Sequence, residues 1–97
     1  MQLTVVLKDG TIKMNKKHQN TYRDIYQNPV KPDILWCDIE VLLLALGAKI
    51  SEGNGSRMRV ELNGERAVFH RPHPEKTTDK GAVKSVRRFL ENAGIKL

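Results

Sequence analysis

Residues 56–70, SRMRVELNGERAVFH, carry the pattern that decides the fold. Residues 56–62 alternate between polar and apolar side chains, which is typical of a half-buried strand, and residues 65–70 return beside them. Between the two segments lies Asn63-Gly64, a pair that two-residue turns favour because both positions need a positive φ angle. The stretch therefore predicts an antiparallel β-hairpin with a type I′ turn.

A two-residue turn also fixes which residues face each other across the hairpin. Leu62 faces Glu65, and the pairing continues outward until Arg57 faces His70. One predicted face packs on the core and holds Met58, Val60, Leu62, Ala67 and Phe69. The other face is open and holds Arg57, Arg59, Glu61, Arg66, Val68 and His70. Opposed Cβ atoms lie about 4.5–5.5 Å apart, so Arg57 and His70 are predicted neighbours on a positively charged surface.

Helical patterns flank the hairpin. Residues 36–46 have apolar side chains at the i, i+3, i+4 and i+7 positions of one stripe, and Gly47 is placed for a left-handed C-cap. A short strand is expected at residues 48–51. A last helix starts at about Asp79 and ends at Gly94, with one apolar stripe made of Val83, Val86, Phe89, Leu90 and Ala93. Three antiparallel strands with helices on one face predict an α+β fold.

Residues 1–33 differ in character from the rest of the chain and are predicted to form an N-terminal arm and an extra helix. Residues 1–13 have the pattern of a strand, an Asp9-Gly10 turn and further extended residues. Met14 opens a segment with helical spacing at Tyr22, Ile25 and Tyr26, and Asn28-Pro29 ends it. The main domain is predicted over residues 34–97.

Charge indicates the kind of partner. The chain of 97 residues has 17 Lys and Arg against 11 Asp and Glu, a net charge of +6. From residue 53 onward there are ten basic and five acidic residues, so most of the excess lies in the second half. A basic half-domain favours a polyanionic partner such as nucleic acid. The single cysteine, Cys37, excludes an intrachain disulfide and a cysteine-rich zinc site, and no apolar run is long enough for a membrane span.

Four segments in a fixed order resemble the HicA family of bacterial toxins over roughly residues 36–97. They are IEVLLLALGAKI at 39–50, Gly55-Ser56, NGERAVFHRPHP at 63–74 and KGAVKSVRRFLENAGI at 80–95. The resemblance implies a fold similar to a double-stranded-RNA-binding domain, with an α-β-β-β-α core. It also implies a cytoplasmic endoribonuclease, an mRNA interferase that cleaves mRNA and inhibits translation without a metal or organic cofactor. A HicB-like antitoxin protein is the implied partner, and operator DNA is bound only through the antitoxin complex.

The sequence departs from the family pattern at one position. The family's catalytic histidine usually follows the Gly-Ser directly, whereas Arg57 stands there in this chain. Two interpretations remain open, an inactive relative or a subgroup whose histidine lies elsewhere. His70 is the natural candidate for a relocated histidine, because the register places it across the hairpin from Arg57.

Histidine suits RNA cleavage because it can exchange a proton near neutral pH and can deprotonate a 2′-hydroxyl. We assign His70 as base or acid, Arg57 as the clamp that stabilises charge on the phosphate, and His73 as a second proton-transfer group. The alternative is that His70 ends a strand and bonds a loop carbonyl, and that His73 only shapes a loop. Three histidines without nearby carboxylates do not predict a metal site.

Basic side chains in and after the hairpin are the predicted nucleic-acid contacts: Arg59, Arg66, Arg71, Lys76, Lys80, Lys84, Arg87 and Arg88. The last four form a strip opposite the apolar stripe of the final helix, although a solvated helix face has the same appearance. Two further function classes stay open. One is a catalytically inactive module that binds RNA or antitoxin; the other is a small DNA-binding regulator, disfavoured because Pro29 and Pro32 disrupt the helix-to-helix connection.

Overall fold

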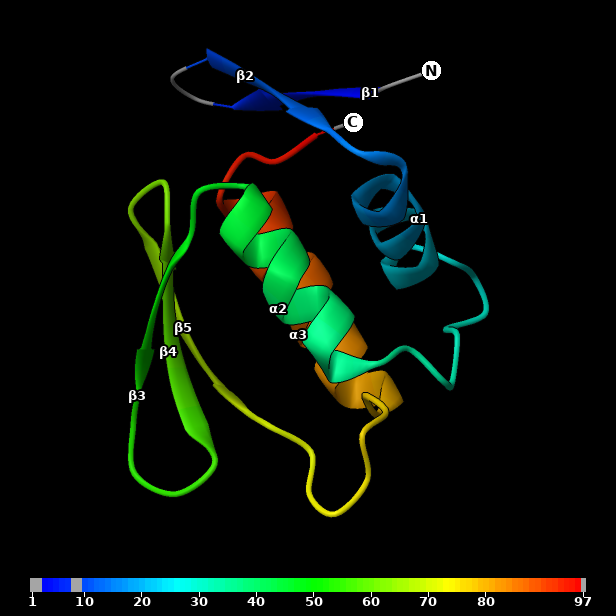
Figure 1. Ribbon diagram of the computed structural model, residues 1–97, viewed down its shortest axis with the longest axis vertical. Helices are drawn as coiled ribbons and strands as arrows, with labels where there is room; N and C mark the ends of the chain where they lie inside the picture. The colour runs from blue at the N-terminus through cyan, green and yellow to red at the C-terminus, as the bar shows by residue number, and fades with distance from the viewer. Residues whose placement is uncertain (1–2, 8–9, 97) are drawn as a thin grey trace.

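The computed structural model describes residues 3–7 and 10–96. Its elements, in chain order, are β1 (Leu3–Leu7), β2 (Gly10–Met14), α1 (Lys16–Ile25), α2 (Trp36–Ala45), β3 (Lys49–Glu52), β4 (Arg57–Leu62), β5 (Glu65–His70) and α3 (Lys80–Asn92). β1 and β2 pair with each other, and β3, β4 and β5 form a separate antiparallel sheet in that order (Figure 1). Within this part of the chain, three helices and a three-stranded sheet confirm the predicted α+β class.

The hairpin has the predicted turn and register. Asn63 and Gly64 have φ angles of 52° and 84°, so both lie in the left-handed region that a type I′ turn requires. Leu62 pairs with Glu65, and the ladder continues to the pairing of Arg57 with His70. This register also determines which side chains face the core. The predicted core face is confirmed, because Met58 and Val60 are 0% and 1% exposed, whereas Val68 on the open face is 54% exposed.

The molecule is layered (Figure 1). α2 and α3 cover one face of the β3–β5 sheet, and α1 packs against them on the side away from the sheet. Aromatic rings join the sheet to the helices, because the Phe69 ring meets Phe89 edge-on at 5.8 Å and lies 5.8 Å from Trp36. The other face of the sheet is left uncovered by these helices.

The helix ends show why two predicted boundaries were wrong. The last helix begins as expected, with the Asp79 side chain accepting a hydrogen bond from the Ala82 N–H at 2.8 Å. The predicted start of the first helix at Met14 was wrong, because Met14 closes β2. The predicted strand at 48–51 lies one residue later, because the Ala48 N–H still bonds the Leu43 carbonyl of α2.

The extra N-terminal helix belongs to the same core as the sheet. Tyr22 and Ile25 of α1 are buried, together with Met14 just before it, in one cluster with the inward side chains of α2, α3 and β4. The Asp9 half of the predicted Asp9-Gly10 turn lies outside the described residues; Gly10 begins β2. None of the helices that the structure describes is long and apolar enough to cross a membrane.

Candidate nucleic-acid interface

Arg57 and His70 face each other at the end of the hairpin farthest from its turn. Both side chains are exposed on the open face of the sheet. The next rung beyond them is closed by a hydrogen bond from the Arg71 N–H to the Ser56 carbonyl at 2.9 Å. An imidazole and a guanidinium are therefore held on a hydrogen-bonded strand pair, where both can reach a ligand on the open face.

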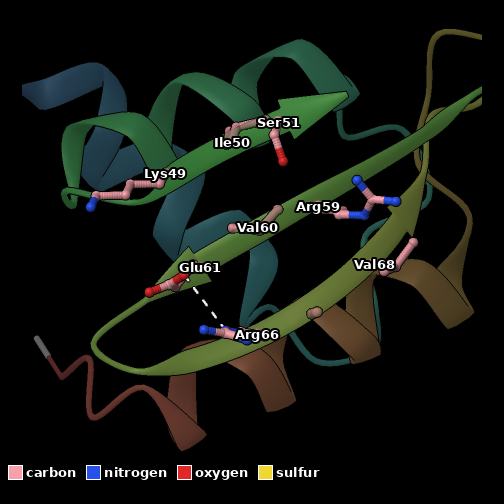
Figure 2. Close-up of a pocket in the computed structure, with 9 residues that line it drawn as sticks. Lys49, Ile50, Ser51, Arg59, Val60, Glu61, Arg66 and Val68 are labelled. Carbon is pink, nitrogen blue, oxygen red and sulfur yellow. Dashed lines mark ion pairs between the residues drawn. The ribbon is translucent and has the colours of Figure 1, made fainter. Parts of the chain in front are cut away.

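A hollow of ≈ 700 Å³ lies on the same face, nearer the turn (Figure 2). Strand pairing brings Ser51 beside Arg59, and Lys49 beside Glu61, in two rows across the sheet. The residues that line the hollow are Lys49, Ile50, Ser51, Arg59, Val60, Glu61, Arg66, Ala67 and Val68. The rows place three cations around one carboxylate, so the hollow suits a negatively charged ligand.

The cations of the hollow differ in whether they already form an ion pair with a carboxylate. Arg66 forms an ion pair with Glu61 at 3.6 Å between Nε and Oε1, with 82% of the Arg66 side chain exposed. Neither Lys49 nor Arg59 takes part in an ion pair within the described part of the chain. These two side chains are available to a bound anion without first breaking an internal contact.

Sequence reasoning missed Lys49 and Ser51 as members of this surface. The hairpin turn fixes the register of β4 with β5, but no turn chemistry fixes the register of β3 with β4, because a longer loop joins them. The alternation of residues 48–51 gives the only sequence signal, and it assigns Lys49 and Ser51 to one face without saying which strand lies beside them.

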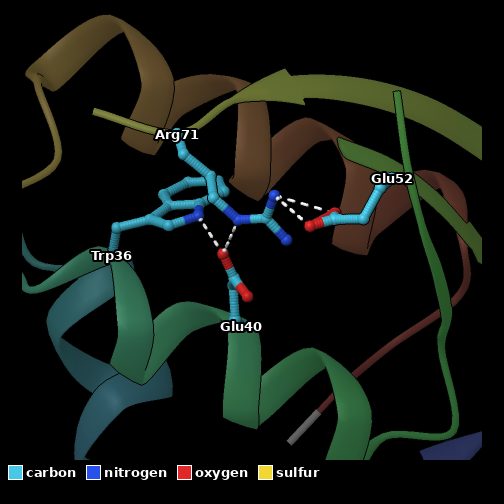
Figure 3. A network of polar contacts seen from close by, with 4 residues as sticks. All are labelled: Trp36, Glu40, Glu52 and Arg71. Atoms are coloured by element: carbon cyan, nitrogen blue, oxygen red, sulfur yellow. Dashed lines mark hydrogen bonds and ion pairs between the residues drawn. The ribbon is translucent and has the colours of Figure 1, made fainter. Parts of the chain in front are cut away.

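Arg71 lies on the opposite side of the sheet from His70, because successive side chains of a strand point to opposite faces. Its Nε–H donates to Glu40 Oε1 at 2.6 Å, and Nη1 donates to both Glu52 oxygens at 2.9 and 2.8 Å (Figure 3). These bonds to Glu40 and then Glu52 raise the pKa of Arg71 above its already high usual value. The structure thus places this predicted nucleic-acid contact in an internal ion-pair network.

His73 lies in the loop after β5, separate from the hollow on the sheet. It is exposed and lines a second concavity of ≈ 560 Å³ beside the start of α2, together with Trp36, Glu40 and Arg71. The far end of the loop is fixed where the Trp36 N–H donates to the Lys76 carbonyl at 3.0 Å. His70 is absent from the lining of this concavity, so the structure does not bring the two histidines into one pocket.

The basic strip of α3 separates into two kinds of residue. Lys80, Lys84 and Arg88 are exposed, as is Lys76 in the preceding loop. Arg87 instead points back to α1, where Nη2 donates to the Gln27 carbonyl at 2.6 Å and Nε donates to the Ile25 carbonyl. α3 covers the inner face of the sheet (Figure 1), and none of its exposed cations lines the hollow on the open face.

Among the described residues, no group of three or more His, Cys, Asp or Glu side chains is placed to hold a metal ion. The functional groups that the open face presents are an imidazole, guanidinium groups, an ammonium group, a hydroxyl and the Glu61 carboxylate, which is paired with Arg66. Such a set can bind phosphates and can transfer protons.

A three-stranded antiparallel sheet with helices on one face and a charged open surface on the other places this protein in the class of small α+β proteins, which is consistent with the expected fold similar to a double-stranded-RNA-binding domain. A family model described as the HicA toxin of bacterial toxin-antitoxin systems matches residues 36–95, from the first residue of α2 to just beyond α3. The match covers more than half of the chain, and the protein belongs to the HicA toxin family. No curated protein matches the chain at the level of whole sequences. No solved structure matches it either.

Membership of this family makes the protein a toxin component of a toxin–antitoxin system. It also implies an antitoxin partner of the HicB type. The matched region contains β3, β4, β5, α2 and α3, and so includes both the Arg57–His70 pair and the basic hollow.

Proposed function

We propose that this toxin is a metal-independent endoribonuclease, which binds mRNA on the open face of the β3–β5 sheet and cleaves it. The observation that carries the proposal is the direct cross-strand pairing of Arg57 with His70 on that face. Arg57 occupies the position where the family usually has its histidine, so the opposing strand supplies the imidazole. The reaction would take place in the cytoplasm, where mRNA is found.

Cleavage in this scheme needs a proton acceptor, an anion clamp and a proton donor for the leaving oxygen. His70 removes the proton from a 2′-hydroxyl, and the resulting oxyanion attacks the adjacent phosphorus. The bond from phosphorus to the 5′-oxygen breaks, that oxygen takes up a proton from His73 or from water, and a 2′,3′-cyclic phosphate remains. The Arg57 guanidinium stabilises the charge that builds on the non-bridging oxygens. His73 is the second proton-transfer group of the proposal, for RNA that reaches around the end of the sheet.

The hollow beside the pair extends the RNA path along the sheet. Lys49, Arg59 and Arg66 would contact backbone phosphates there, with the Ser51 hydroxyl as a further donor. The exposed cations Lys76, Lys80, Lys84 and Arg88 form an outer set. Arg71 and Arg87 are left out of the proposed RNA path because carboxylates and carbonyls already use their guanidinium groups.

We further propose that the HicB-type antitoxin silences the toxin by covering the open face, and that operator DNA is bound only through the complex. Residues 34–97 would form the toxin domain, with residues 1–33 as an added segment. The second candidate function is a catalytically inactive module that binds RNA or antitoxin. The observation that favours it is the arginine at position 57.

Induced expression in a bacterial host tests the proposal. Wild type is compared with His70→Ala, Arg57→Ala and His73→Ala, and with His18→Ala as a control far from the face. Growth and the cleavage of reporter mRNA are scored, and expression levels are matched by immunoblot. The proposal expects arrest and cleavage for wild type and for the control, and a loss of both for His70→Ala.

Arrest and cleavage by His70→Ala at the wild-type level would remove His70 from the mechanism. If wild type binds RNA but neither cleaves it nor arrests growth, the inactive module is the correct interpretation. Purified wild type should also cleave equally well with and without a chelator, because no step uses a metal. A loss of cleavage in chelator would overturn the metal-independent scheme.

A further inference from the structure

We infer that Arg71 is a positioning residue, which holds the Arg57–His70 pair in place from the inner side of the sheet. It therefore does not bind RNA, although it lies next to His70 in the sequence. The inference rests on the proposed function only for what the pair does chemically. The claim that Arg71 fixes the geometry of His70 rests on the contacts of Arg71 itself.

Three separate segments meet at the Arg71 side chain (Figure 3). Glu40 comes from the middle of α2, Glu52 is the last residue of β3, and Arg71 directly follows β5. Its guanidinium holds one carboxylate through Nε and the other through Nη1, at 2.6–2.9 Å. The ion pair thereby links β3, on one side of β4, to the end of β5, on the other side.

Glu40 is itself held in a fixed orientation. The Trp36 indole N–H donates to Oε1 of Glu40 at 2.6 Å, and this same oxygen accepts from Arg71. Trp36 is 4% exposed and packs against Phe69 in the core. The network therefore links Arg71 to the packed hydrophobic core. Charge-assisted bonds of this kind are the stronger ones, and here only 29% of the Arg71 side chain and 23% of the Glu40 side chain are exposed.

The main chain of Arg71 completes the connection to the candidate site. Its N–H bonds the Ser56 carbonyl at 2.9 Å, immediately beyond the pairing of Arg57 with His70. The pair thus lies between the regular ladder on one side and the Arg71 rung on the other. A strand end would fray without such a rung, and His70 would lose its fixed direction on the open face.

The test uses the full-length protein and reads the imidazole of His70 directly. Two-dimensional NMR of the His70 ring is recorded for wild type, Arg71→Ala, Arg71→Lys and Glu52→Ala. We expect Arg71→Ala to shift and broaden the His70 ring signals, with a smaller effect for Arg71→Lys because an ammonium retains one ion pair. Glu52→Ala removes one partner at a side chain that is 70% exposed, so this variant should fold and should show a partial effect.

Arg87→Ala is the matched control, because it removes an internally bonded arginine from a different part of the molecule. It should lower stability and leave the His70 signals unchanged. Unchanged His70 signals in both Arg71→Ala and Glu52→Ala would overturn the inference. A shift of the same size in Arg87→Ala would also overturn it, since the effect would then report general loosening.

Two further measurements separate positioning from RNA contact. The logarithm of RNA affinity is plotted against the logarithm of salt concentration; the slope falls by about 0.7 for each lost contact to single-stranded RNA. The slope should be unchanged in Arg71→Ala and should fall in Arg59→Ala. An equal fall in both would make Arg71 a phosphate contact and overturn the inference.

Cleavage should drop about 10- to 100-fold in Arg71→Ala through misplacement of His70. If wild type does not cleave RNA, the proposed function fails, and the ring signals still decide the role of Arg71.

Discussion

Tyr26 and Arg87 are joined by two contacts that run in opposite directions. The Tyr26 hydroxyl donates to the main-chain carbonyl of Arg87 at 3.3 Å, while the Arg87 guanidinium lies 5.7 Å from the centre of the Tyr26 ring. The same guanidinium donates to carbonyls at and beyond the end of α1. Burial, and next the neighbouring Tyr22, raise the pKa of Tyr26, so its hydroxyl remains a donor at any physiological pH. This junction attaches the N-terminal helix, outside the family match, to α3 inside it.

Removing the Arg87 side chain should destabilise the protein. Arg87→Ala leaves carbonyl groups at the end of α1 without their charged donor, at a cost of about 1.5–3 kcal/mol in the free energy of unfolding. Urea unfolding followed by circular dichroism measures this cost. Arg88→Ala is the control, since its exposed side chain should matter by no more than about 0.5 kcal/mol. Equal effects of the two substitutions would contradict the role given to Arg87.

The two faces of the hairpin should respond very differently to truncation. Met58 is 0% exposed, so Met58→Ala should cost about 2–5 kcal/mol of stability through lost burial and a residual cavity. Val68 is 54% exposed on the open face, so Val68→Ala should change stability little. Thermal unfolding of the two variants side by side checks the assignment. Similar melting temperatures for both would show that the register is wrong.

Position 64 of the hairpin turn should tolerate asparagine better than alanine. Gly64 has a φ angle of 84°, where a Cβ atom costs roughly 1–2 kcal/mol in the left-handed conformation. Nothing lies within 4 Å of a Cβ built there, so the cost of Gly64→Ala is conformational rather than steric crowding by neighbours. Asparagine adopts this conformation more readily, so Gly64→Asn should lose less stability in chemical denaturation. A larger loss for the asparagine variant would argue against the type I′ turn.

Lys49 should contribute to RNA affinity if the proposed path along the sheet is correct. Lys49→Ala should weaken binding and reduce the salt slope by about 0.7, as expected for one lost phosphate contact to a single strand. Fluorescence anisotropy with a labelled oligoribonucleotide at several salt concentrations provides both values. Lys16→Ala removes the same charge at the start of α1, away from the hollow, and should leave the slope as in wild type. An equal change of slope in the two variants would show that the loss of affinity comes from the lower net charge and not from a phosphate contact of Lys49.

Local chemistry explains why the hairpin could be predicted in detail. The Asn63-Gly64 turn sets the register, and the register sets which side chains are buried, so the opposition of Arg57 and His70 depends on a few residues only. The helix stripes are similarly local, because apolar spacing and the end signals at Asp79 and Gly94 lie within each segment.

Longer-range contacts explain what the sequence could not provide. Arg71 and Arg87 look like surface cations in the sequence, yet their partners are 19 and 31 residues away for Arg71 and about 60 for Arg87. No pattern within either segment predicts such pairings. The position of Lys49 in the hollow depends in the same way on how β3 meets β4, which a longer loop leaves open.

The pairing of Arg57 with His70 has a consequence for how this surface can change in evolution. In β4 and β5, every second side chain faces the core, whereas the side chains between them lie on the open face and do not pack in the core. An exchange between histidine and arginine at position 57 therefore alters the chemistry of the surface without disturbing the buried side chain of Met58 next to it. Such a sheet can lose, relocate or regain an activity by single substitutions while its architecture is inherited unchanged.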